Sequence, residues 1–138
     1  MEIKLPEKIK LDGWDIEVRP YLTLSECKVI ADKMCECEDV FDRNSMLVAC
    51  VMSACTNFFD NNDVEYTYED IVYSGLWDDV LFAGESYFYD LSSCIELINS
   101  EVKRRTSLEG QLESISKAID PKLIEQVIKA VEDNGSEQ

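Results

Sequence analysis

One stretch of 59 residues, Asn44 to Val102, contains no lysine and no arginine. It carries 11 acidic residues and 10 of the 13 aromatic residues in the chain. Aromatic rings favour burial in a core, and the hydroxyl groups of tyrosines can lie at the edge of that core. Carboxylates without nearby cations must face water or a basic partner. The stretch therefore predicts a packed core beneath a strongly negative surface.

The charge of the whole chain narrows the choice of partner. The 138 residues have a formal net charge of −16, and 46% of them are hydrophobic. A chain of this length and composition can build its own core as one domain. The negative charge repels nucleic acid and anionic membrane surfaces. It attracts a basic protein, and the alternative is that it serves solubility alone.

Six cysteines could form a disulfide framework or remain thiols. Met1 is followed by charged residues rather than by the apolar run of a secretory signal. Most of the cysteines lie among apolar residues at helical spacing, where a free thiol behaves as a small hydrophobe. We therefore expect reduced thiols and a cytoplasmic location. No apolar run reaches the length of a membrane span.

The N-terminal residues predict a β-hairpin. Two alternating segments, Ile9 to Leu11 and Trp14 to Val18, flank the pair Asp12-Gly13. Asp-Gly between such segments favours a two-residue turn with positive φ. A lone hairpin is marginal in water, so we expect it to pack on helices or to pair with another edge.

Most of the remaining chain has helical periodicity. Thr23 with Glu26 forms a capping box, and the following helix is expected to reach about Cys37. A helix from Asn44 to Phe59 carries no charge, which predicts a central position. Further helices are expected over three later segments. These are residues 67–75, with Gly75 as a left-handed cap, residues 76–83, and residues 85–107.

The sequence thus predicts a mainly α protein, a helical bundle with a small N-terminal β-hairpin. Residues 1–107 form a helical domain with the hairpin, and residues 108–138 form a C-terminal helical arm, either separate or part of the same domain. A helix is expected from Asp120-Pro121, with proline at the first helical position. Its apolar stripe is Leu123, Ile124, Val127, Ile128 and Val131.

Two features of the sequence have part of the pattern of a metal site. The segment Asp60 to Glu65 begins like an EF-hand loop, but Glu65 replaces the turn glycine and Ile71 replaces the final bidentate glutamate. A zinc site lacks both histidine and a Cys-x2-Cys pair. We therefore expect no metal and no cofactor.

Enzymatic activity has no support in the sequence. Without histidine, a serine or cysteine nucleophile lacks its commonest base. Acidic pairs such as Asp78-Asp79 are too abundant in this chain to indicate a glycosidase pair. The five glycines form no phosphate-binding loop. We predict that the protein is not an enzyme.

The aromatic and acidic run has two interpretations. In the first, Tyr73, Trp77, Phe82 and Phe88 belong to the core and the acids only face water. In the second, the carboxylates imitate a phosphate backbone and occupy a basic groove in a partner. The acids concerned are Asp60, Asp63, Glu65, Glu69, Asp70, Asp78, Asp79 and Glu85.

A family resemblance rests on the hairpin, on Val18–Glu26 (VRPYLTLSE) leading into a helix, and on Tyr73–Val80 (YSGLWDDV). The layout resembles small acidic proteins of the structural-gene clusters of tailed phages and prophages of Gram-positive bacteria. Among these it is most similar to tail assembly chaperones. The resemblance covers about the first 80 residues. It implies a mainly helical protein of the host-cell cytoplasm that binds tape measure protein and tail tube subunits.

The first functional prediction is therefore a non-enzymatic phage-type protein that binds another viral assembly protein. The expected contact surfaces are the hairpin edge or the C-terminal helix with Leu123, Ile124, Val127 and Ile128. The alternative is an acidic DNA-mimic inhibitor of a basic host nucleic-acid enzyme, of anti-CRISPR or anti-restriction type. Acids in a continuous convex stripe would favour mimicry, whereas an exposed apolar groove would favour the chaperone. The oligomeric state stays open.

Overall fold

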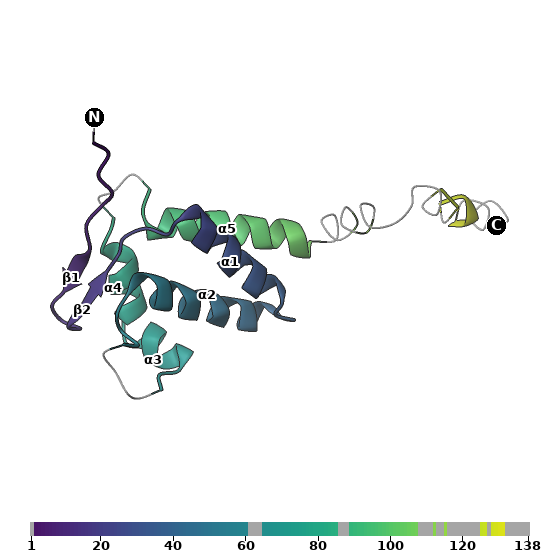
Figure 1. Cartoon of the computed structure of the whole chain (residues 1–138). Helices are drawn as coiled ribbons and strands as arrows, with labels where there is room; N and C mark the ends of the chain where they lie inside the picture. The colour runs from purple at the N-terminus through teal and green to yellow at the C-terminus, as the bar shows by residue number, and fades with distance from the viewer. Residues whose placement is uncertain are drawn as a thin grey trace. The chain divides into compact units, whose positions relative to one another are not determined.

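The computed structural model describes residues 2–60, 65–85 and 89–107, together with residues 112, 115, 125, 126 and 128–131. The chain divides into two compact units, Met1–Val102 and Lys103–Gln138. The predicted fold class is confirmed: the protein is mainly helical with a small N-terminal hairpin (Figure 1). Whether the predicted arm, residues 108–138, is a separate domain stays a prediction.

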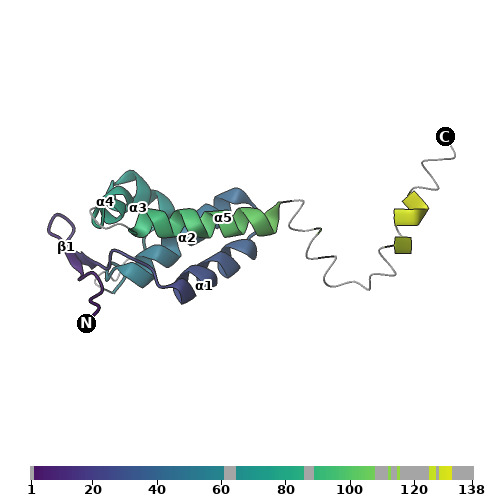
Figure 2. The ribbon, with the colours of Figure 1, turned by 90° about the horizontal axis from the view of Figure 1, so that it is seen from above.

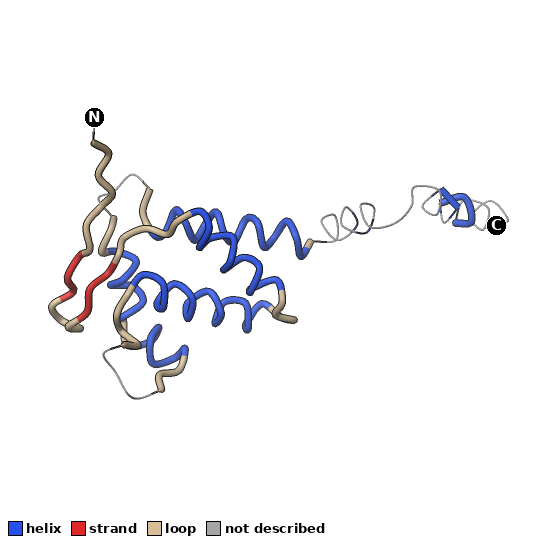
Figure 3. Tube along the Cα trace, viewed as in Figure 1, coloured by secondary structure: helices blue, strands red, loops and turns tan. Residues whose placement is uncertain are grey.

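Figure 3 colours the helices, strands and loops along the chain. Among the described residues up to 107 there are two strands and five helices. They are β1 (Ile9–Leu11), β2 (Ile16–Val18), α1 (Leu24–Cys35), α2 (Val40–Cys55), α3 (Tyr68–Tyr73), α4 (Leu76–Phe82) and α5 (Leu91–Thr106). Seen from above, α1, α2 and α5 run alongside one another, and the hairpin lies at the end where α3 and α4 gather (Figure 2).

The hairpin forms as predicted, but its turn is different. The last antiparallel pair is Leu11 with Ile16, so the loop holds four residues rather than two. The positive φ falls on Asp15, at 51°, and not on Gly13. The amide of Trp14 donates to the carbonyl of Leu11 at 3.1 Å, which closes the turn without a left-handed Asp-Gly pair.

The free edge of β2 attaches to the end of α2. Val18 forms an antiparallel bridge with Thr56, and the Arg19 amide donates to the Cys55 carbonyl at 2.7 Å. The Glu17 amide donates to Asn57 Oδ1 at 3.0 Å. The expectation that the hairpin pairs with another edge is therefore confirmed.

The first two helices begin at side-chain caps. The Thr23 and Glu26 capping box at α1 is present, although α1 ends at Cys35 rather than Cys37. The predicted start of α2 at Asn44 was wrong, because Asp39 accepts a hydrogen bond from the Asp42 amide and opens the helix at Val40. The predicted end at Phe59 was also wrong. Thr56 takes an extended conformation and ends α2 at Cys55.

The central position of α2 is confirmed by its burial. Five of its side chains are buried, and the helix packs against both α1 and α3. The buried residues are Leu47, Val48, Val51, Met52 and Cys55. Apart from Asp42 and Arg43 near its start, α2 has no charged residue, which suits a helix that is covered on several sides.

The two short helices follow the predicted pattern closely. Thr67 and Asp70 form the capping box of α3. Gly75 follows with a φ of 90°, the left-handed conformation that glycine adopts without strain. The chain then re-enters a helix at Leu76, and α4 ends at Phe82.

The predicted start of α5 at Glu85 was wrong. Glu85 lies in a turn and the helix begins at Leu91. Asp90 is the cause, since its carboxylate accepts from the amide of Ser93 at 3.0 Å and from the Ser93 hydroxyl at 3.2 Å. The helix ends at Thr106, next to the predicted Ser107.

In the described chain, every buried hydrophobic residue lies between Ile16 and Val102. Beyond Ser107, the described residues 112, 115, 125, 126 and 128–131 are helical, in agreement with the predicted helices. The predicted start of the last helix at Asp120-Pro121 lies outside the described residues.

Candidate protein-interaction site

Seven of the eight acids predicted to meet a partner are described, and all seven side chains are exposed. They are Asp60, Glu65, Glu69, Asp70, Asp78, Asp79 and Glu85. The eighth, Asp63, lies outside the described residues. None of the seven forms an ion pair with a described residue. Their charge is therefore directed at solvent or at a partner.

A five-residue pattern recurs on the two short helices. It comprises two acids, a buried aliphatic residue, a half-buried aliphatic residue and an exposed aromatic ring. The segments are 69–73 (EDIVY) in α3 and 78–82 (DDVLF) in α4. In an α-helix, residues three and four apart lie on one face, so each ring shares its face with the acids.

The prediction that Tyr73 and Phe82 belong to the core was wrong. Tyr73 is 79% exposed and Phe82 is 63% exposed. Helices of six and seven residues bury one narrow stripe, and Ile71 and Val80 occupy that stripe. Trp77 packs partly buried against the core as predicted, and Phe88 lies outside the described residues. The surface of α3 and α4 therefore combines carboxylates with exposed rings.

A hollow of about 350 Å³ lies between the hairpin loop and α4. Trp14 lines it, and the indole Nε1 donates to Asp79 Oδ2 at 2.7 Å. Phe82 forms part of the opposite wall, and Asp12 and Lys10 belong to the loop side. This hydrogen bond fixes the ring of Trp14 against the acidic end of α4.

An open groove of about 450 Å³ runs between α1 and α2. Its lining is Ser25, Glu26, Val29, Lys33, Ala49, Cys50, Ser53 and Ala54. The α2 side consists of small residues, and Val29 on α1 is 51% exposed. Glu26 and Lys33 supply the only charges of the lining. The groove is therefore largely apolar on an otherwise acidic molecule.

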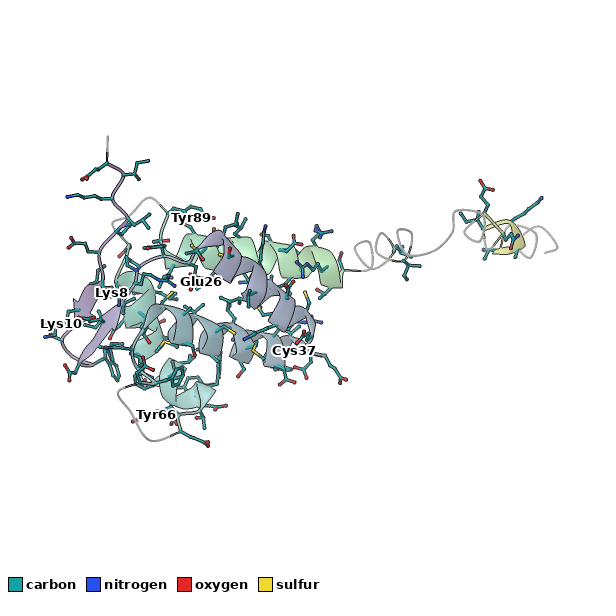
Figure 4. All side chains as sticks on the ribbon, viewed as in Figure 1. Lys8, Lys10, Glu26, Cys37, Tyr66 and Tyr89 are labelled. Carbon is teal, nitrogen blue, oxygen red and sulfur yellow. The ribbon has the colours of Figure 1, made fainter. Side chains whose placement is uncertain are left out.

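One ion pair secures the wall of this groove. Arg19 Nη2 donates to Glu26 Oε2 at 2.6 Å and to the carbonyl of Ala54 at 3.1 Å. The Arg19 guanidinium also lies 5.2 Å from the ring centroid of Tyr21. Glu26, labelled in Figure 4, thus joins α1 to the segment between the hairpin and α1.

The pKa values of this pair shift in the directions that mutual stabilisation requires. Partial burial alone would raise the pKa of Glu26, but the hydrogen bonds from Arg19 and Thr23 outweigh it and lower that pKa. Partial burial alone would lower the pKa of Arg19, and the hydrogen bond to Glu26 reverses the direction and raises it. The pair is therefore charged at neutral pH.

The surfaces predicted to bind a partner are only partly described. Ile128 is helical and 52% exposed, whereas Leu123, Ile124 and Val127 lie outside the described residues. Within the described chain, β1 pairs only with β2, so its outer edge is open. Lys10 of β1 projects outward from the hairpin (Figure 4), and lysine on an edge strand disfavours pairing with a further strand.

All six cysteines are free. Burial, together with the neighbouring Cys94, raises the pKa of Cys27 to about 11. Burial also raises the pKa of Cys55 to about 11, although Arg19 opposes the shift. At neutral pH these two groups remain protonated thiols, which are poor nucleophiles and poor metal ligands.

The described residues contain no group of three or more potential metal-ligating side chains. Residues 61–64 of the EF-hand-like loop lie outside the described residues. No described helix is both long enough and apolar enough to span a bilayer.

No family model matches the chain, and no curated protein or solved structure is significantly similar to it.

Proposed function

We propose that the protein is a non-enzymatic binding protein of phage-type particle assembly, which holds a helical segment of another viral protein. The observation that carries this proposal is the open apolar groove between α1 and α2. Amphipathic helices commonly bind by placing their apolar face in such a groove. The layout of the sequence, similar to that of tail assembly chaperones, supports the same role.

The side chains of the groove fit a helix better than a small polar ligand. Ala49, Cys50, Ser53 and Ala54 are small, so the backbone of a partner helix can approach α2 closely. Val29 offers an apolar wall that is half exposed in the unbound protein. Burying these residues contributes favourable free energy without requiring many polar partners.

The net charge of the chain selects the partner by charge. A net charge of −16 speeds encounter with a basic protein and discourages acidic ones. The bound segment is therefore expected to present an apolar stripe flanked by lysine or arginine.

The test is co-expression with tail proteins encoded beside it, comparing the native chain with Ala49→Phe. Ala49 is exposed and lines the groove, so the added ring fills the groove without disturbing the core. We expect affinity for the partner to fall about 10-fold or more, as at a binding hot spot. The matched control is Ser92→Phe, which adds the same ring at an exposed position of α5 outside the groove. Equal binding by all three proteins would contradict the proposal.

A second candidate is an acidic DNA mimic that inhibits a host nucleic-acid enzyme. The exposure of seven carboxylates that form no ion pair with a described residue favours it. The interleaved rings of Tyr73 and Phe82 count against it, because a phosphate-like surface does not require them. A mimic would lose affinity steeply as salt rises. Binding through the groove would weaken less as salt rises, because it rests mainly on apolar contacts, and it would respond to Ala49→Phe.

A further inference from the structure

The hollow between the hairpin loop and α4 brings together two aromatic rings and two carboxylates from distant parts of the chain. Trp14 and Asp12 come from the hairpin loop, and Asp79 and Phe82 come from α4. The hydrogen bond from Trp14 to Asp79 joins residues 65 positions apart. This surface is separate from the α1–α2 groove and shares no residue with it.

The chemistry of the hollow suits a cation. Aromatic faces attract cations through the ring quadrupole, and carboxylates add charge and hydrogen-bond acceptors. Asp79 uses Oδ2 for the indole of Trp14, and no described residue donates to its Oδ1. Asp12 is exposed and has no ion pair with a described residue.

Lys10 is the opposing charge in the lining. Figure 4 shows it projecting outward from the hairpin. Two carboxylates against one ammonium leave the lining negative, and Asp78 adds a further exposed carboxylate on α4. An anionic ligand would be repelled here. A neutral apolar ligand would leave the carboxylates without a partner.

We propose that this hollow binds an arginine side chain of a partner protein. The planar guanidinium can lie against the exposed ring of Phe82 while its N–H groups donate to Asp79 and Asp12. Lysine is a poorer fit, because its ammonium is a more strongly hydrated point charge that neither stacks nor forms paired hydrogen bonds. The partner therefore presents an arginine beside the surface that it buries.

The experiment is an NMR titration of the full chain with three acetylated, amidated tetrapeptides of equal length. One contains arginine, one contains lysine and one contains citrulline, the neutral isostere of arginine. We expect the arginine peptide to shift the indole N–H signal of Trp14 and the amides of residues 79–83. The lysine peptide should bind about 3-fold more weakly, and the citrulline peptide should cause no shift.

Two variants identify the ring that makes the contact. Phe82→Leu retains an apolar side chain at an exposed position and should weaken the arginine response about 3-fold. Tyr73→Leu removes the corresponding ring of α3 and should leave the Trp14 response unchanged. The proposal would be overturned if the citrulline peptide caused equal shifts or if Phe82→Leu left the arginine response unchanged. It would also be overturned if the shifts spread over all acidic segments or were absent at millimolar peptide.

Discussion

Glu26 uses its two carboxylate oxygens for different partners. Oε1 accepts from the backbone amide of Thr23 at 2.9 Å, and Oε2 accepts from Arg19 at 2.6 Å. The first bond starts α1, and the second ties α1 to the segment that follows the hairpin. One side chain therefore links local helix capping to tertiary structure.

The substitution Glu26→Gln separates these two contributions. Glutamine can still accept the Thr23 bond, as in natural capping boxes, but it loses the charge facing Arg19. We expect the free energy of unfolding at pH 7 to fall by about 1 kcal/mol, since the pair is partly exposed. Urea unfolding of both proteins at several pH values measures this change in the free energy of unfolding.

The difference in free energy of unfolding between the native chain and Glu26→Gln depends on pH with a defined sign. Folding lowers the pKa of Glu26 from its ordinary value of 4.5. Its stabilisation is therefore present above pH 4.5 and is lost as the pH falls through the lower pKa of the folded protein. The gap between native and Glu26→Gln should close below that value. A gap that is constant down to the acid transition would show that Glu26 and Arg19 do not form this pair.

At the scale of elements, the turn after α4 packs tightly on the segment after β2. Gly84 is buried, and a Cβ placed on it would lie 2.6 Å from Pro20 Cβ and 3.2 Å from the Pro20 carbonyl oxygen. Pro20 is itself buried, and its ring cannot rotate away. This contact requires a residue without a side chain.

Gly84→Ala should therefore lower the free energy of unfolding by about 1–3 kcal/mol, the usual cost of overpacking. Gly13→Ala is the matched control, because a Cβ there meets nothing within 4 Å and the residue does not need a positive φ. Denaturant unfolding of both variants measures the difference. If both variants are equally stable, the close approach of Gly84 to Pro20 is not present in solution.

The sequence predicted elements best where the signal was local. The capping boxes at Thr23 and Thr67 and the left-handed Gly75 were recognised because each depends on residues within one turn. The starts of α2 and α5 were missed because Asp39 and Asp90 act as caps without the full capping-box pattern.

The candidate sites were predictable only in part. The exposure of the carboxylates could be predicted, because the sequence around them contains no lysine or arginine. The repeated pattern at 69–73 and 78–82 is visible in the sequence, and its spacing would have identified Tyr73 and Phe82 as surface residues. The hollow was not predictable, because it exists only where Trp14 reaches Asp79 across 65 positions. The α1–α2 groove likewise depends on helix packing.

At the scale of the whole molecule, charge is divided unequally. Residues 1–102 hold seven basic and 22 acidic residues, for a net charge of −15, whereas residues 103–138 hold six and seven, for a net charge of −1. Nearly all of the negative field therefore comes from the unit that carries the hairpin and the described core.

A chain ending at residue 107 should fold by itself. All buried hydrophobic residues in the described chain lie at or before Val102, so the truncation removes none of them. We expect its thermal midpoint to stay within about 4 °C of the full chain, which corresponds to less than about 1 kcal/mol for a domain of this size. Circular dichroism at increasing temperature measures it. A larger drop would place residues 108–138 in the same cooperative domain.

The attachment of β2 to the end of α2 also affects the order in which the new chain can fold. The Glu17 amide leaves the ribosome 40 residues before Asn57, which accepts its hydrogen bond. At 5–20 residues per second, that interval lasts about 2–8 seconds. A lone hairpin is marginal in water, so Ile16 and Val18 stay uncovered during this period. The emerging hairpin is therefore open to nascent-chain chaperones until Asn57 has also left the ribosome.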